Sequence, residues 1–251
     1  MFECGFKIGS REKKYASVAR KLFDNGLINY LELFAVSNSY HETISFWKEI
    51  NIPFVIHAPH SVAGLNLSIK ENRKDNTGKI SEAFMFADAL HSSYVIFHLG
   101  TNGSLEESIY QLGNFSENRI LVENKPKYGV NGELCVGVRK EDIIFAMKSL
   151  NCGFVLDFGH AICAANSLKI SPLEFIDDFI LLNPIMYHLT DGDYLSEKDQ
   201  HLSYGTGSFP LSELIMRIKS NSKVTNEASK SIENETSIID DFLFLNKHNV
   251  K

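Results

Sequence analysis

The feature that most constrains the fold is an alternation of short aliphatic, β-branched and aromatic runs with segments of helical periodicity. Eight such runs follow one another along the chain: Glu3 to Ile8, Tyr30 to Ala35, Phe54 to His57, Tyr94 to His98, Ile120 to Glu123, Phe154 to Asp157, Ile185 to His188 and Val224 to Glu227. This alternation indicates βα units and a parallel sheet. Since eight strands close a barrel, we expect a (β/α)8 TIM barrel.

The length and composition fit one domain of this kind. The chain has 251 residues, and (β/α)8 barrels commonly occupy about 250 residues, so we predict a single TIM-barrel domain over residues 1–251. A hydrophobic share of 44% and a charged share of 22% are ordinary for a globular protein. A net charge of −6 argues against a surface that attracts DNA everywhere, but it leaves room for a narrow basic groove.

The ends and the cysteines indicate a cytoplasmic protein that does not contact membranes. No basic region followed by an apolar segment opens the chain, and no apolar stretch is long enough to span a bilayer. The four cysteines lie far apart without a C-x-x-C pair, which argues against a disulfide framework or a thiolate zinc site. We expect them to be reduced and mostly buried.

Two helix starts carry capping signals. Ser104 with Glu107 reads as a capping box, and Ser171 with Glu174 repeats it with Pro172 at the first helical position.

The expected strand-to-helix connections are unequal in length. Those after the third, fifth and seventh strands are long and polar, over His57 to Asn76, Asn124 to Val138 and Leu189 to Ser208. Long loops at the C-terminal face of a barrel are where active sites are built.

Six of the expected strands end in a residue that can bind a metal: His57, His98, Glu123, Asp157, His188 and Glu227. Barrel closure would bring all six to one mouth, where they cannot all be buried as isolated polar groups. Imidazole and carboxylate together suit Zn, Mn, Fe or Co. Glu32, on the second strand, we expect to be a polar rim residue without a metal-binding role.

Two short motifs enlarge this candidate site. Asp157-x-x-His160 places a second imidazole just past the sixth strand, and Asp199-x-His201 lies in the long seventh loop. Each motif alone is weak evidence, because charged residues are common in surface loops.

Taken together, the motifs resemble a known family. His57-Ala-Pro, Phe97-His98-Leu-Gly100, Glu123-Asn124, Asp157-Phe-Gly-His160-Ala, His188-Leu-Thr-Asp191 and Asp199-Gln-His201-x-x-x-Gly205-x-Gly207 are similar to motifs of the xylose isomerase-like barrel superfamily. Within it they look most like AP endonuclease family 2, the endonuclease IV type. The resemblance runs from the first strand to the last.

The resemblance implies a metal-dependent hydrolase of DNA repair with two or three zinc ions, Mn or Mg being alternatives. His57, His98 and a bridging Glu123 would hold one metal; Glu123, Asp157, His188 and Glu227 a second; His160, Asp199 and His201 a third. A hydroxide shared by two metals is a nucleophile at neutral pH. Such a site, with Glu123 and Glu227 at its catalytic centre, would cleave a phosphodiester without a side-chain nucleophile.

On the substrate side, the family positions that match here are His60, Asn124, Asp191, Gly205 and Gly207. The partner implied is a phosphoester, in the family's case DNA with an abasic site. His60 replaces the family's aromatic residue after His-Ala-Pro, and Asp193 lies where a basic residue is expected. His60 is also an alternative ligand to His57; we favour His57 because it ends the apolar run.

A second interpretation is a sugar or sugar-phosphate isomerase or epimerase. Relatives of that kind use a single Mn or Mg, which Glu123, Asp157, His188 and Glu227 would hold here, with Glu123 and Glu227 moving a proton between adjacent carbons. The Tyr-Leu-Glu-Leu-Phe segment around Glu32 also resembles the isomerases. An isomerase has no evident use for the remaining imidazoles and the D-x-H pair, so their presence favours the hydrolase. A silent binding module explains the ligand set least well, and the sequence does not indicate an oligomeric state.

Overall fold

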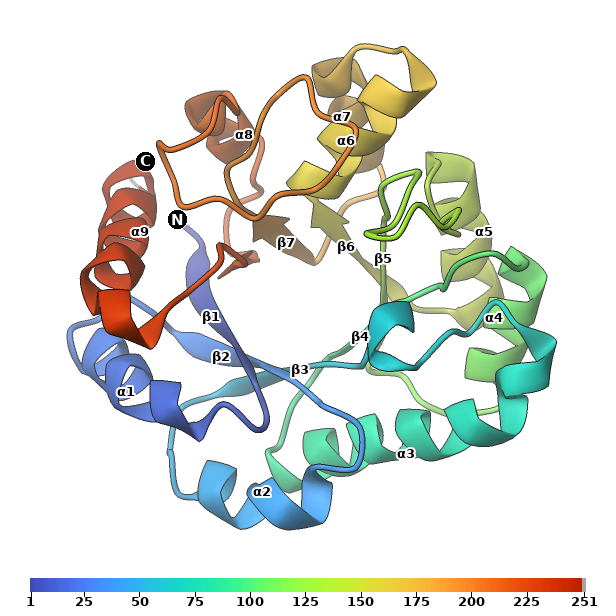
Figure 1. Cartoon of the computed structure of the whole chain (residues 1–251), viewed down its shortest axis with the longest axis horizontal. Coiled ribbons are helices and arrows are strands. Elements are labelled where there is room, and N and C mark those ends of the chain that lie inside the picture. Colours follow the sequence, from blue (N-terminus) through green and yellow to red (C-terminus); the bar gives the residue numbers. More distant parts are fainter. Residues whose placement is uncertain (250–251) are drawn as a thin grey trace.

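Eight parallel strands close into a barrel in the computed structural model, which describes residues 1–249 (Figure 1). Each strand pairs with the next, and β8 pairs with β1. The strands are β1 (Glu3–Gly9), β2 (Tyr30–Phe34), β3 (Phe54–His57), β4 (Val95–His98), β5 (Ile120–Glu123), β6 (Gly153–Asp157), β7 (Met186–Leu189) and β8 (Lys223–Asn226). The prediction of a (β/α)8 barrel is confirmed. Residues 250–251 of the predicted domain lie outside the described residues.

The predicted strands match the observed ones to within one residue at either end. The differences matter at the last two strands. His188 is the penultimate residue of β7, and Glu227 follows the end of β8 instead of ending it. Both residues nevertheless stay at the C-terminal mouth of the barrel.

The helices form a ring around the strands (Figure 1). They are α1 (Ala16–Asp24), α2 (Tyr40–Lys48), α3 (Arg73–Ala89), α4 (Leu105–Gly113), α5 (Lys140–Leu150), α6 (Phe158–Leu168), α7 (Pro172–Ile180), α8 (Leu211–Met216) and α9 (Glu235–His248). Short 3-10 helices cover Lys13–Tyr15, Ser61–Ala63, Lys70–Asn72 and Ile232–Asn234. Within residues 1–249, none of the helices is both long and apolar enough to cross a membrane.

The capping predictions are only partly right. The Ser104 hydroxyl accepts a hydrogen bond from the Glu107 N–H, but the return half of the box is missing because the Ser104 N–H already donates to the Ser68 carbonyl. The Glu107 carboxylate instead pairs with Arg73. At α7 the predicted box is wrong: Ser171 makes no side-chain capping bond, and Pro172 with its preset φ starts the helix.

The long polar loops are confirmed at the mouth of the barrel. They cover residues 58–72, 124–139 and 190–210, after β3, β5 and β7. The first is shorter than predicted, because the 3-10 turn Lys70–Asn72 runs directly into α3. All four cysteines are free, with Cys4 and Cys163 buried and Cys135 and Cys152 partly exposed.

The barrel interior consists of two layers of side chains that lie two residues apart on every strand. Alternate residues of a strand point to the same face, so residues i and i+2 both face the barrel axis. The lower layer comprises Gly5, Tyr30, Val55, Ile96, Leu121, Val155, Met186 and Thr225, of which the six hydrophobic members form a separate buried cluster. The upper layer comprises Lys7, Glu32, His57, His98, Glu123, Asp157, His188 and Glu227.

Gly5 shows how closely the lower layer is packed. A Cβ atom at this position would come within 2.2 Å of the Tyr30 ring. Tyr30 therefore fills the space on the β1 side of the barrel axis, and its hydroxyl pairs with Thr225 at 2.8 Å. The lower layer closes the barrel beneath the polar one, so the upper layer is reached only from the C-terminal mouth.

Candidate metal centre

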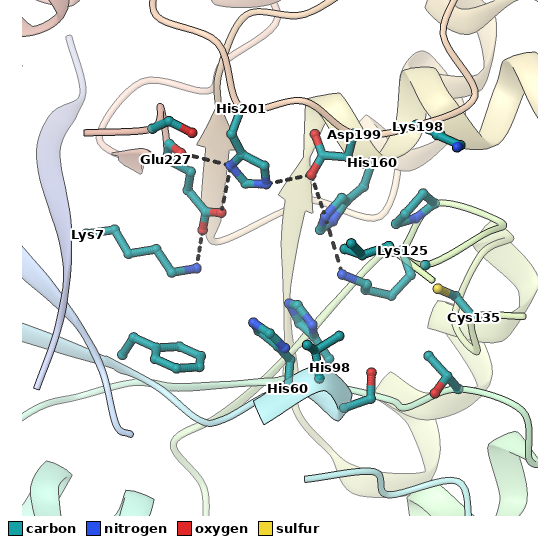
Figure 2. A pocket seen from close by; sticks show the side chains of 18 of the residues that line it. Lys7, His60, His98, Lys125, Cys135, His160, Lys198, Asp199, His201 and Glu227 are labelled. Carbon is teal, nitrogen blue, oxygen red and sulfur yellow. Dashed lines mark hydrogen bonds and ion pairs between the residues drawn. The ribbon is translucent and has the colours of Figure 1, made fainter. Parts of the chain in front are cut away.

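A cavity of about 580 Å³ opens at the C-terminal mouth, directly above the upper layer. Its walls include Lys7, His98, His160, Asp199 and Glu227, which point toward a common centre in Figure 2. The predicted convergence of strand-end side chains is therefore present in the fold. The sequence-predicted ligands fall into three groups within this cluster.

The first group consists of His57, His98 and Glu123. The Nε2 atoms of His57 and His98 lie 3.2 Å and 3.1 Å from Oε2 of Glu123. His98 and Glu123 are in register on the adjacent strands β4 and β5, which brings their side chains to the same height. His60 belongs to none of the ligand groups found among the described residues, so the geometry favours His57 over His60.

The second group surrounds His188. Its Nδ1 atom lies 2.8 Å from Glu227 Oε1, 3.4 Å from Glu123 Oε2 and 3.9 Å from Asp157 Oδ2. Asp157 and His188 are in register on β6 and β7. Glu123 thus faces both this group and the first one, as a bridging carboxylate would.

The third group joins a strand end to the seventh loop. Asp199 Oδ2 lies 2.5 Å from Nε2 of His201 and 3.4 Å from Nε2 of His160 (Figure 2). His160 is held in place because Asp157 caps helix α6 and accepts its backbone N–H at 2.7 Å. The Asp-x-x-His motif therefore brings its two side chains together through a helix cap.

Hydrogen bonds fix which ring nitrogen each histidine presents to the cluster. The Nδ1 atoms of His57, His160 and His201 donate to backbone carbonyls at 2.7, 2.9 and 2.8 Å, which leaves each Nε2 lone pair facing the carboxylates. In His188 the roles reverse: Nε2 donates to Glu32 at 2.9 Å, and Nδ1 faces the cluster. Metal-ligating histidines characteristically donate their second nitrogen in this way.

Unpaired buried atoms test whether the cluster suits a metal. His188 Nδ1 and Glu123 Oε1 are buried and have no hydrogen-bond partner among the described residues. Leaving such atoms unpaired is costly unless a ligand completes them. Several donor separations, 3.1 to 3.4 Å, also lie near the distance of about 3.3 Å that separates two ligands of a tetrahedral zinc with bonds of about 2.0–2.1 Å. The residues present therefore fit divalent cations.

The electrostatics point the same way. Burial raises the pKa of the Asp157 carboxyl to about 6; His160 opposes this shift, and the neighbouring Glu123 carboxylate adds to it. Burial opposes protonation of His160, yet Asp157 and Asp199 outweigh it and raise the pKa of His160 to about 10. Carboxylates packed this closely attract positive charge, either a proton or a metal ion.

Glu32 is not the polar rim residue that we expected. It is completely buried on β2, where it accepts hydrogen bonds from His188 and from the Thr225 hydroxyl at 2.7 Å and forms an ion pair with Lys7 at 3.2 Å. Lys7 was not identified from the sequence. Its ammonium forms an ion pair with Glu32. It also hydrogen-bonds to Glu227 (Figure 2). The one sequence signal for Lys7 was the alternation along β1. Lys7 follows Gly5 by two residues, so both residues face the barrel interior.

Of the residues predicted to contact substrate, only His60 lines the cavity. Its ring stacks near His98, with 5.7 Å between centroids. Asn124 is buried behind the site, where its amide donates to the Asp157 carbonyl and accepts the Asp157 N–H. Asn124 thus holds the end of β6 and does not face a substrate.

Asp191, Gly205 and Gly207 build the seventh loop. The buried Asp191 carboxylate accepts the backbone N–H groups of Gly205 at 2.9 Å and Gly207 at 3.0 Å. A Cβ at Gly207 would come within 2.5 Å of Asp191, so the close approach requires glycine. None of the three lines the cavity, and their contacts hold the loop that carries Asp199 and His201.

Solved structures resemble the whole barrel. A D-tagatose 3-epimerase-like protein matches with a TM-score of 0.72 and 21% identity over 98% of this chain and 99% of its own. Endonuclease IV from Thermus thermophilus matches with a TM-score of 0.69 and 22% identity over 98% of this chain and 99% of its own. These likenesses show that the chain shares the TIM-barrel fold of these proteins. The TTHB071 protein of Thermus thermophilus, from crystals soaked with ZnCl2, has the same barrel, with a TM-score of 0.70 and 16% identity over 99% and 100%.

Sequence comparison adds nothing to this assignment. The chain matches no protein-family model. It also has no match among curated proteins. Since barrels of similar shape include both an endonuclease and an epimerase, the likeness establishes the fold and leaves the activity to the site residues.

Proposed function

We propose that this protein is an enzyme, a metal-dependent phosphoester hydrolase that uses a di- or trinuclear centre. The observation that carries the proposal is that three of the five overlapping groups of potential metal ligands use different histidines, each with a carboxylate: His57, His98 and Glu123; Asp157, His188 and Glu227; and His160, Asp199 and His201. A single-metal isomerase would use only the group around His188. The groups of His57 and His98 and of His160, Asp199 and His201 would have no role in that chemistry.

Cations held by these groups would activate water and neutralise phosphate charge. The chain itself keeps the donors ready for them. Glu123 faces two groups at once, and Glu227 is held between His188 and Lys7. Donors fixed in this way need little rearrangement when charge develops in the transition state.

The cavity offers no activated thiolate that could replace water as the nucleophile. Cys135 is the cysteine among the cavity-lining residues, and burial raises the pKa of its thiol. A thiol with a raised pKa is a poor nucleophile near neutral pH. This supports direct attack by water on a phosphoester.

The first test is metal analysis of protein purified without chelators. We expect two or three Zn or Mn ions per chain, and one ion or fewer would contradict the hydrolase.

The second test is hydrolysis of bis(4-nitrophenyl) phosphate by His201→Ala. We expect cleavage to be abolished with an unchanged circular dichroism spectrum, whereas the exposed His41→Ala serves as a matched control with full activity. Unchanged cleavage by His201→Ala would exclude a role for the third donor group.

A sugar isomerase or epimerase is the second candidate. The buried contact of Glu32 with His188 supports it, because it strengthens the group around His188 that such an enzyme needs. The likeness to a D-tagatose 3-epimerase-like fold is compatible with it. Full activity on a sugar with one Mn per chain, together with solvent-deuterium incorporation at carbon, would establish this candidate and eliminate the hydrolase.

A further inference from the structure

Lys125 has no role in the proposed chemistry so far, although it lies beside the third donor group. It follows Glu123-Asn124 at the end of β5, and its half-buried side chain lines the cavity. Its ammonium nitrogen lies 3.3 Å from Nε2 of His160 (Figure 2). This places a fixed positive charge at the edge of the candidate metal centre.

Within residues 1–249, no carboxylate oxygen lies within 4 Å of the Lys125 ammonium. The other cavity lysines differ from it. Lys7 pairs with Glu32 and Glu227, Lys230 lies 3.6 Å from Glu12, and Lys198 is exposed to solvent. Lys125 therefore combines partial burial with the lack of a counter-ion, which favours the binding of an anion. An ammonium has three N–H donors that an anion can accept.

Another part of the cavity wall is apolar. Phe34 and Val36 line it, and the His60 ring packs 5.2 Å from the Phe34 ring. The cavity thus combines a cationic group with an apolar wall, which suits a molecule with an anionic group attached to a small organic body.

The fifth loop limits the size of what can enter. It is folded onto itself by the bridge Tyr128–Leu134 and tied to the loop after β4 by the bridge Thr101–Cys135. A cavity of about 580 Å³ lies within the range of roughly 300–1,000 Å³ that is typical of small-molecule sites. A nucleic-acid duplex needs instead an extended surface with several phosphate-binding cations.

We propose that the substrate is a small-molecule phosphoester whose phosphate is held by Lys125 beside His160, with its organic part against Phe34 and His60. This inference rests on the proposed hydrolase function and names its substrate class. Lys125 would contact the phosphate directly, beside the donor groups of the metal centre. Duplex DNA is then not the substrate.

The test measures the binding of inorganic phosphate to the metal-loaded protein by calorimetry, with the metal content of every variant determined in parallel. A hydrogen bond from a charged donor is worth about 10-fold or more in affinity. We expect Lys125→Met to weaken phosphate binding by at least that factor with unchanged metal content, and Lys125→Arg to retain most of the affinity. Lys148→Met, on the exposed face of α5, is the matched control and should bind like the wild type.

Three results have distinct meanings. Wild-type phosphate affinity in metal-loaded Lys125→Met would overturn the role of Lys125. Binding of an abasic-site duplex more tightly than of small phosphoesters, with the same dependence on Lys125, would overturn the small-molecule substrate while leaving the hydrolase intact. A protein that binds one metal ion or none would contradict the proposed hydrolase function itself, whatever its affinity for phosphate.

Discussion

The two layers inside the barrel come from the same eight strands but differ in every physical respect. The lower layer is mostly apolar and fills the barrel, whereas the upper layer, two residues further along each strand, is entirely ionisable. Buried apolar side chains stabilise a fold, while buried charges cost free energy unless they are paired. The difference assigns stability to the lower layer and supports placing the proposed chemistry in the upper layer. Substitutions in the two layers should therefore have opposite consequences.

The largest effect is expected in the upper layer at Glu123, which faces two donor groups. Replacing Glu123 by Gln removes a shared anionic ligand, and loss of the several kcal/mol that metal ions contribute in a transition state corresponds to a fall of about 10³-fold in kcat/KM. Metal analysis should show fewer ions per chain. The comparison of layers would break down if Glu123→Gln kept its metals and activity but lost thermal stability.

The reciprocal change is Leu121→Ala, two residues earlier on β5. Leu121 is 2% exposed, and truncating a buried leucine lowers the free energy of unfolding by about 2–5 kcal/mol. Urea unfolding measures the loss, and the folded fraction should keep the wild-type metal content. A stable Leu121→Ala protein that binds fewer metals would mean that the lower layer shapes the site directly.

The smallest effect sharpens the role of Glu32, which belongs to the upper layer but to none of the three predicted ligand groups. Glu32→Gln weakens the hold on His188, and removing a partner of a metal-ligating histidine typically costs about 10–100-fold in metal affinity. Competition with a chromogenic chelator measures this. The control is Glu42→Gln, whose carboxylate pairs with Arg11 at the surface. An effect no larger than that of the control would make Glu32 only a counter-ion for Lys7.

Most of the fold and many of the candidate ligands could be predicted, because both follow from local pattern. A run such as Leu121-Val122-Glu123 shows where a strand ends, and parallel strands in a closed barrel must end at one mouth. The proposed ligands His57, His98 and Asp157 were predicted on the same ground. Most of the predicted substrate contacts do not line the cavity. Asp191 and Gly207 looked like binding residues, but their pattern reflects how the seventh loop is held together.

The sequence alone determined the period of two that separates the layers, the positions of the strand ends and the kinds of donor atom available. Tertiary structure decided the rest. Only barrel closure could bring Lys7 and Glu32 beside His188, more than 150 positions away in the chain, and only the hydrogen bonds of that packing chose which nitrogen His188 presents. Strand patterns report the local direction of a side chain, whereas pairing, charge and burial depend on neighbours that the chain meets after folding.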